Sequence, residues 1–363
     1  MKKIRGTKKK RIFFIILNLA LVILAAACFT GVAILSNLLD SQKVAERWQG
    51  ENELAFSQVS CYIPVDEKIS LDDVYAFRYA ILAKLKEAAL DTEGTDGLFV
   101  DAWCTTGKVN VSTSLGKGDV SVTAVGGSFF DFHPILLKSG SYITENDLMK
   151  DRVLLDEETA WMLFGGTDLQ GMELKVNGVP FVVAGVIERE DDFASRKAYT
   201  AGMGIYMSYD AYVQLAEGAG INCYELVMAE PVDGFVLSFV KEKFPIGSGE
   251  IVDNTNRYSF GSLTKLIGQF GSRSMQTLGV IYPYWENAAR CTEDWCTLFM
   301  FLGLAATVLP VVTVIVIIVR YLRRGKDKLE DDVIPKLKDG AEEAIRVRQR
   351  RRWEKKHGMH EKN

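Results

Sequence analysis

Histidine, proline and cysteine are scarce in this chain, which has 363 residues but only three histidines, eight prolines and six cysteines. With 48% hydrophobic residues, that composition excludes collagen, low-complexity disorder and a small disulfide scaffold. The histidines, His133, His357 and His360, are not spaced from one another or from the cysteines as metal ligands are, so we expect no metal site. The length suggests about two or three folding units.

Motifs for nucleotide binding and catalysis are also missing from the sequence. There is no Gly-Lys-Ser/Thr phosphate-binding loop, and Gly202-Met203-Gly204 lacks the third glycine of a dinucleotide fingerprint. Paired carboxylates such as Asp72 and Asp73 have the spacing of helix caps or of a solvated surface. Because no histidine, serine or metal constellation accompanies them, we expect no catalytic residues, no cofactor and no enzymatic activity.

The net charge of −4 hides an uneven distribution of charge along the chain. Residues 1–11 carry a net charge of +7 and residues 320–363 carry +6, so the sequence between them carries −17. Inside each basic end lies a run without charge, 24 residues from Ile12 to Leu35 and 23 residues from Thr297 to Val319. About 20 apolar helical residues span a bilayer, so both runs predict transmembrane helices. Basic ends around an acidic middle are typical of membrane topology, and we expect no nucleic-acid partner.

The first apolar run has two other interpretations. A basic leader followed by an apolar core is typical of a cleaved signal peptide, but such cores are shorter, at about 7–15 residues. The sequence from Leu24 to Cys28 resembles a lipobox, but it has Ala25 where a large aliphatic residue is usual, and the chain stays apolar beyond it. We therefore favour an uncleaved anchor.

The basic ends also predict the orientation in the membrane, because positively charged flanks stay in the cytoplasm. We expect a two-pass cell-membrane protein with both termini cytoplasmic and its main domain extracytoplasmic. Its predicted parts are a basic N-terminus at 1–11, a transmembrane helix at 12–36, an extracytoplasmic domain at 37–295, a second transmembrane helix at 296–319 and a basic tail at 320–363.

Pro310 lies in the middle of the second apolar run, where proline removes a backbone hydrogen bond and tends to kink a helix. Thr307 and Thr313 lie three residues either side and could satisfy the freed backbone groups. The proline is either a tolerated kink or a hinge. We favour the tolerated kink and keep Pro310 as a candidate hinge.

The extracytoplasmic segment predicts an α+β fold. Polar, helix-compatible stretches at 40–56 and 284–299 predict helical stalks beside the spans. Strand patterns flank helical periodicity at 57–104 and again at 222–254, which predicts two strand–helix–strand units. Two such units can form a ferredoxin-like β-α-β-β-α-β sheet, with an inserted, mostly-β subdomain at about 105–221.

Two local signals in this segment are the strongest. Ser70 followed by Asp73 is a variant of the capping box and predicts the start of the first helix. Asn177-Gly178 between two alternating runs predicts a hairpin inside the insert.

A possible disulfide follows from the predicted sheet. The second and third strands of a ferredoxin-like sheet are antiparallel neighbours, and here these are 98–104 and 222–229. Cys104 ends one strand and Cys223 begins the other, so the two could pair, and outside the cytoplasm a disulfide could persist. Two buried free thiols are the alternative, and Cys61 is a competing partner.

The stretch from Val122 to Glu188 carries a series of features in one order. They are a Phe-Phe-Asp-Phe entry, a Ser-Gly-Ser-Tyr-Ile-Thr turn, a Val-Leu-Leu-Asp strand, a helix ending in Leu-Phe-Gly, Gly171, the Asn-Gly turn and the strand Phe-Val-Val-Ala-Gly-Val. Together they resemble the periplasmic core domain of MacB/FtsX-type ABC transporter permeases. The span–domain–span arrangement over 12–320 extends the resemblance.

The resemblance implies a permease-like membrane subunit of an ABC transporter system, in which an ATPase moves the spans and the spans move the extracytoplasmic domain. That ATPase would be a separate subunit, because this sequence has no phosphate-binding loop. The family has four spans, whereas the sequence after Val319 is polar. A second membrane subunit or a homo-oligomer would then complete the permease. The alternative is a two-span structural or sensory membrane protein that uses the domain only for binding.

The basic tail has no counterpart that can be transferred from the family residue by residue. Its segment AEEAIRVRQRRRWEKK, which begins at Ala341, could replace an ATPase contact, bind anionic membrane lipid or stay solvated. We favour lipid binding or solvation, because basic segments beside a span commonly meet lipid headgroups.

Overall fold

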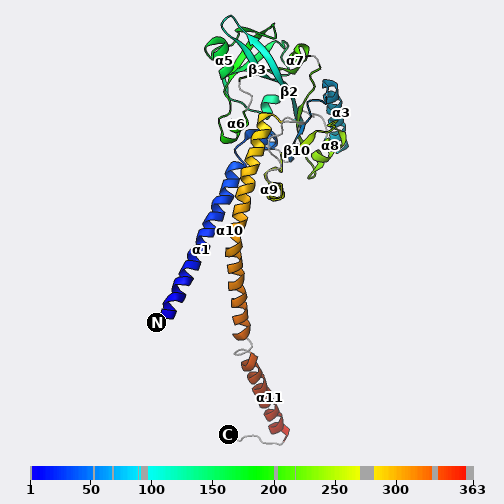
Figure 1. Cartoon of the computed structure of the whole chain (residues 1–363). Helices are drawn as coiled ribbons and strands as arrows, with labels where there is room; N and C mark the ends of the chain where they lie inside the picture. Colours follow the sequence, from blue (N-terminus) through cyan, green and yellow to red (C-terminus); the bar gives the residue numbers. More distant parts are fainter. Residues whose placement is uncertain are drawn as a thin grey trace. The chain divides into compact units, whose positions relative to one another are not determined.

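The computed structural model describes residues 2–51, 54–67, 69–88, 90, 97–199, 203–216, 218–269, 282–328 and 334–356 (Figure 1). The chain divides into two compact units. The first, Phe29–Phe301, is called the domain unit below, and the second, called the terminal unit, combines Met1–Cys28 with Leu302–Asn363.

The domain unit is built on one mixed ten-stranded sheet in the order β10-β1-β9-β2-β3-β8-β5-β7-β4, with β6 paired to β2 and β7. The pairs β3–β8 and β5–β7 are parallel and the others are antiparallel. The sheet and its helices confirm the α+β class. The strands are β1 Phe56–Tyr62, β2 Phe99–Ser112, β3 Lys117–Gly127, β4 Leu137–Gly140, β5 Arg152–Asp156, β6 Glu173–Val176, β7 Val179–Ile187, β8 Gly204–Ser208, β9 Cys223–Ala229 and β10 Glu250–Asp253.

Helices connect these strands and extend from both ends of the domain sequence. Two helical stretches, Lys9–Leu35 and Tyr284–Lys326, are long and apolar enough to cross a membrane. The helices are α1 Lys2–Leu35, η1 Asp40–Gln42 (a 3-10 turn), α2 Val44–Gln49, α3 Leu71–Glu87, α4 Phe129–Phe132, α5 Glu157–Phe164, α6 Phe193–Ala198, α7 Tyr209–Leu215, α8 Phe235–Lys243, α9 Phe260–Ile267, α10 Tyr284–Lys328 and α11 Ile334–Lys356.

Both predicted strand–helix–strand units are present, as β1-α3-β2 and β9-α8-β10. Their strands occupy the adjacent positions β10-β1-β9-β2, and all three pairs are antiparallel. The helices α3 and α8 pack together through Phe77 and Phe239, whose ring centroids are 5.4 Å apart. Ser70 caps α3 as predicted: its hydroxyl accepts from the Asp73 backbone, and the Asp73 carboxylate accepts from the Ser70 backbone at 2.8 Å.

The strands of the predicted insert continue the same sheet. Strand β2 runs unbroken through residue 105, because its hairpin with β3 pairs residues from Ala102 to Ser112. Asn177 and Gly178 join β6 to β7 in the predicted hairpin, with φ of 49° and 85°. A two-residue hairpin turn with positive φ at both positions favours this residue pair, because asparagine and glycine tolerate that conformation.

The two connections between the sheet and the apolar helices differ in structure. Helix α10 runs continuously from its first residue, so the helical extension predicted over 284–299 is confirmed. The helix predicted over 40–56 is wrong, because α1 ends at Leu35 and is followed by η1 and the short α2. The Asn37 side chain donates to the Ala33 carbonyl at 2.7 Å, which satisfies one of the carbonyls left free at a helix end.

Candidate functional site

Strand β1 carries three polar side chains on one face, although every residue of the strand is buried. Side chains alternate between the faces of a strand, so Gln58, Ser60 and Tyr62 share one face while Val59 and Cys61 share the other. The second face joins the apolar core beneath α3 and α8. Buried polar groups require hydrogen-bond partners. The hydrogen-bond partners of Gln58 and Tyr62 include residues in the segments that lead to the two apolar helices.

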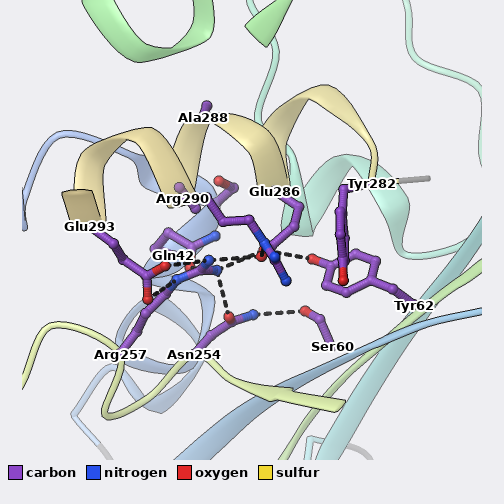
Figure 2. A network of polar contacts seen from close by, with 12 residues as sticks. Gln42, Ser60, Tyr62, Asn254, Arg257, Tyr282, Glu286, Ala288, Arg290 and Glu293 are labelled. Carbon is purple, nitrogen blue, oxygen red and sulfur yellow. Dashed lines mark hydrogen bonds and ion pairs between the residues drawn. The ribbon is translucent and has the colours of Figure 1, made fainter. Parts of the chain in front are cut away.

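Arg257 lies at the centre of these partners (Figure 2). It follows β10, its side chain is 1% exposed, and its Nη1 and Nη2 donate to the two carboxylate oxygens of Glu286 at 2.7 and 2.8 Å. Nη2 also donates to Glu293 at 3.1 Å, and Nη1 donates to Gln42 at 3.2 Å. Such two-pronged guanidinium–carboxylate pairing is both strong and directional. The name polar joint is used below for Gln42, Ser60, Asn254, Arg257, Glu286, Arg290 and Glu293.

Helix α10 supplies three members of the polar joint from one of its faces. Glu286, Arg290 and Glu293 are four and three residues apart, so they lie on one side of the helix, and Glu286 and Glu293 point toward Arg257 (Figure 2). The Arg290 Nε donates to Glu286 at 2.7 Å, and its Nη2 donates to Glu250 of β10 at 3.0 Å. Glu286, which is fully buried, therefore accepts hydrogen bonds from two arginines that belong to different segments of the chain.

The charges of the polar joint stabilise one another. Burial would raise the pKa of Glu286, but Arg257 and Arg290 outweigh that effect and hold this pKa below its ordinary value. Burial also opposes the charge on Arg257, but Glu286 and Glu293 raise its pKa well above the ordinary value. Both groups are thus charged at neutral pH. Removing one partner of a buried ion pair typically costs about 3–5 kcal/mol, because the other charge is left unpaired.

The segment after α1 is also bound to β1 and to Arg257. The Gln58 side chain of β1 donates to the Ser41 carbonyl at 2.8 Å and accepts from the Val44 backbone at 3.1 Å. Together with the bond from Arg257 to Gln42, these contacts attach η1 and the start of α2 to β1. Both connections to the apolar helices are therefore held by β1 and Arg257.

From Arg257 a chain of hydrogen bonds leads into the middle of the sheet. Its Nη1 donates to Asn254 at 3.2 Å, and Asn254 donates to the Ser60 hydroxyl at 2.7 Å (Figure 2). Ser60 donates in turn to Glu225 of β9 at 2.8 Å. Glu225 also pairs with Nε2 of His133, which follows α4. Hydrogen bonds therefore connect Arg257 with β1, with β9 and with the residue that follows α4.

The role of the polar joint is to hold structural elements in position. Its arginines and glutamates neutralise one another, and among the described residues no group of histidine, cysteine, aspartate and glutamate is placed to hold a metal ion. What the arrangement offers is a connection between the first turns of α10 and the sheet within the domain unit.

A cavity of about 280 Å³ lies elsewhere in the domain unit, beside β2 and the start of α3. Its lining includes Tyr75, Trp103, Glu145 and Lys150. The Trp103 side chain is buried, and its Nε1 has no hydrogen-bond partner in the part of the chain that the structure describes.

The two cysteines of the predicted disulfide are brought together by the sheet. Cys104 of β2 and Cys223 of β9 are directly opposite in the antiparallel register, and both are buried free thiols. Cys61 lies opposite Tyr224, one position along β9, so its side chain points to the other face of the sheet. The geometry therefore disfavours Cys61 as the competing partner, and the Cys104–Cys223 disulfide stays a prediction.

The candidate hinge Pro310 lies inside α10, which stays helical on both sides of it. Thr307 donates to the Leu304 carbonyl at 2.7 Å, and Thr313 donates to the Leu309 carbonyl at 2.8 Å. The carbonyl that Pro310 frees is that of residue 306, four positions earlier. Neither threonine bond reaches it, and the hinge stays a prediction.

The sequence interpretation missed the polar joint. The residues of α10 carry a visible signal, because Glu286, Arg290 and Glu293 repeat at helical spacing in a segment interpreted only as a stalk. The alternation of Gln58, Ser60 and Tyr62 with apolar residues is a second signal. The loop that carries Arg257 offers none.

Comparison with known proteins identifies the domain. The family model of the MacB-like periplasmic core domain matches residues 15–234. The extracellular domain of the noncanonical ABC-type transporter YknZ from Gram-positive bacteria is similar at 16% identity and a TM-score of 0.36, over 51% of this chain and 88% of that one. The periplasmic region of MacB from Actinobacillus actinomycetemcomitans is similar at 16% identity and a TM-score of 0.39, over 62% of this chain and 98% of that one. A comparison with curated proteins gives no match.

The fold defines a class of protein, an α+β domain whose sequence is flanked by two helices apolar enough to cross a membrane. The family match covers more than half of the chain, and the chain belongs to the MacB-like periplasmic core domain family. The resemblance stated from the sequence is therefore confirmed. The chain is a membrane protein whose domain lies outside the cytoplasm.

Proposed function

We propose that this chain is the permease-like membrane subunit of a MacB/FtsX-type ABC transporter system, in which ATP-driven movement of the spans is passed to the extracytoplasmic domain. The observation that carries the proposal is the polar joint, where the start of α10 and the segment after α1 are both fixed to Arg257 and β1. Family membership supports the transporter class.

The proposed coupling uses α10 as a lever. The helix carries the charge-free run 297–319 and, before it, Glu286, Arg290 and Glu293. A tilt or shift of the run would move these three side chains, and the bonds of Glu286 and Glu293 would move Arg257 with them. From Arg257 the movement would follow Asn254 and Ser60 into β1 and β9.

The ATPase of this system is a separate subunit, and a second membrane subunit or another copy of this chain completes the permease. Both termini are cytoplasmic, as the net charges of +7 and +6 at the two ends favour. The strand order β10-β1-β9-β2 with α3 and α8 supports a ferredoxin-like unit within the larger sheet. The chain itself catalyses no reaction, and the transported or bound substance meets the domain outside the cytoplasm.

Orientation is tested with single added cysteines and a membrane-impermeant thiol reagent. Leu148 is 97% exposed in the domain and Gln349 is exposed in α11, so Leu148→Cys and Gln349→Cys place one reporter at each side. In intact cells we expect labelling of Leu148→Cys alone, above the background of the unmodified chain. Labelling of Gln349→Cys without permeabilisation would contradict the orientation.

The transporter assignment is tested by purifying the full chain from cross-linked native membranes and identifying its partners by mass spectrometry. We expect an ATPase with a phosphate-binding loop among the cross-linked proteins. A purified complex without such an ATPase would favour the alternative, a two-span structural or sensory protein that uses its domain only for binding.

A further inference from the structure

Helix α11, Ile334–Lys356, carries a stripe of residues along one side that no carboxylate interrupts. The stripe consists of Ile334, Leu337, Ala341, Ile345, Arg348 and Arg352, which recur three or four residues apart and so lie along one face. Its first four members are apolar and its last two are basic. The acidic residues of the helix, Asp339, Glu342, Glu343 and Glu354, all lie off the stripe.

The arginines of α11 differ in what surrounds them. Away from the stripe, Arg350 lies 3.3 Å from Glu354, and Arg346 lies 4.0 Å from Glu342, so carboxylates offset part of their charge. On the stripe, Arg348 and Arg352 form no ion pair with a carboxylate of the described residues. Two arginines without a carboxylate partner therefore lie on the same face as the apolar side chains of the stripe.

The apolar side chains of the stripe are also exposed to solvent. Ile334 is 43% exposed, Leu337 is 68% exposed and Ile345 is 55% exposed. A helix that combines exposed apolar side chains with basic side chains on one face suits a bilayer surface, where the apolar groups enter the headgroup region and the arginines meet phosphates. An acidic protein surface would match the arginines but would not require three open aliphatic side chains beside them.

We propose that α11 lies along the membrane with this stripe facing the lipid, and that its partner is an anionic bilayer surface. This extends the proposed function, because it relies on the tail being beside the cytoplasmic leaflet. Binding of α11 to lipid would hold this part of the chain close to the bilayer. In the sequence, α11 begins shortly after α10 ends at Lys328.

The test uses the full chain in lipid nanodiscs, either of phosphatidylcholine alone or with about 30% phosphatidylglycerol, and follows amide hydrogen exchange over 334–353. Because both faces of a disc are open and no ATPase is present, the result does not depend on the orientation in cells or on the transporter assignment. We expect slower exchange of α11 in the anionic discs. Raising the salt to about 1 M, where the Debye length falls to about 3 Å, should remove most of the difference.

Two matched double variants separate the stripe from total charge. Arg348→Gln with Arg352→Gln and Arg346→Gln with Arg350→Gln each remove two positive charges, the first pair on the stripe and the second pair away from it. One basic residue at an anionic surface is worth about fivefold in binding, so the first pair should lower the protection by roughly 25-fold. The second pair should lower it far less. Unchanged exchange over β1 and β9 verifies that the domain is folded.

Two results would overturn the proposal. Equal exchange of α11 in neutral and anionic discs would exclude an anionic bilayer surface as the partner. Equal loss of protection in the two double variants would mean that net charge, and not the stripe, attracts the helix.

Discussion

Replacing Arg257 by methionine removes the centre of the polar joint while keeping a side chain of similar length. Glu286 and Glu293 then lose the guanidinium that binds both, although Glu286 keeps Arg290. Breaking a buried ion pair in this way costs about 3–5 kcal/mol. We therefore expect the free energy of opening of the domain unit to fall by that amount at neutral pH, which corresponds to exchange roughly 10²–10⁴-fold faster over β1 and β10.

The destabilisation caused by Arg257→Met should depend on pH, because Glu286 is a carboxylate that loses Arg257 as a partner. In the unchanged protein the pKa of Glu286 is held below its ordinary value, so its contribution is fully present above the unfolded-state pKa of about 4.3 and is lost as the pH falls through the folded-state pKa. In Arg257→Met, burial raises the pKa of Glu286 with less opposition. The penalty should therefore be largest near neutral pH and shrink as the pH falls, because a proton neutralises the carboxylate that lost its partner.

The assay is amide hydrogen exchange of the full chain in detergent, corrected for intrinsic rates, at neutral and acidic pH. Arg196→Met is the matched control, because Arg196 is an exposed arginine of α6, and surface substitutions usually stay within about 0.5 kcal/mol. An effect of Arg257→Met no larger than that of the control, or a penalty that does not shrink on acidification, would refute the account of a buried, charged joint.

Glu286→Gln should destabilise the domain more than Glu293→Gln in denaturant titration, because Glu286 binds both arginines and is fully buried, and the reverse order would contradict the assigned roles. Non-reducing peptide mapping of protein purified without reductant should find Cys104 joined to Cys223, and two free thiols there would refute the pairing. Gly178→Val should cost about 1–3 kcal/mol in thermal unfolding, because φ is 85° at that turn, and a neutral effect would argue against the hairpin.

Local signals predicted much of the sheet. The capping residue Ser70 and the Asn177-Gly178 turn act within a few residues of themselves, so they occur as predicted. Composition predicts the strands β2 and β9, and their neighbouring positions in the sheet place Cys104 opposite Cys223. Strand β2 extends past residue 105, the predicted start of the insert, because its pairing with β3 continues to Ser112. Where that pairing ends depends on the partner strand.

The polar joint could not be predicted in the same way because it is a product of tertiary structure. Arg257 lies in a loop without periodicity, and its partners Gln42 and Glu286 are far from it in sequence. The helix predicted over 40–56 failed for a related reason. Its residues suit a helix locally, but η1 and α2 are held by Gln58 and Arg257, which are contributed by other segments.

The central claim is that the polar joint passes ATP-driven movement to the domain. The most direct measurement is hydrogen exchange over β1 and β9 in the complex of the full chain with its ATPase, with and without ATP, for the unchanged chain and for Arg257→Met. The account predicts that ATP changes the exchange of these strands in the unchanged chain, and that the change disappears in the variant while ATP hydrolysis continues. An ATP-dependent change of equal size in both chains would contradict it.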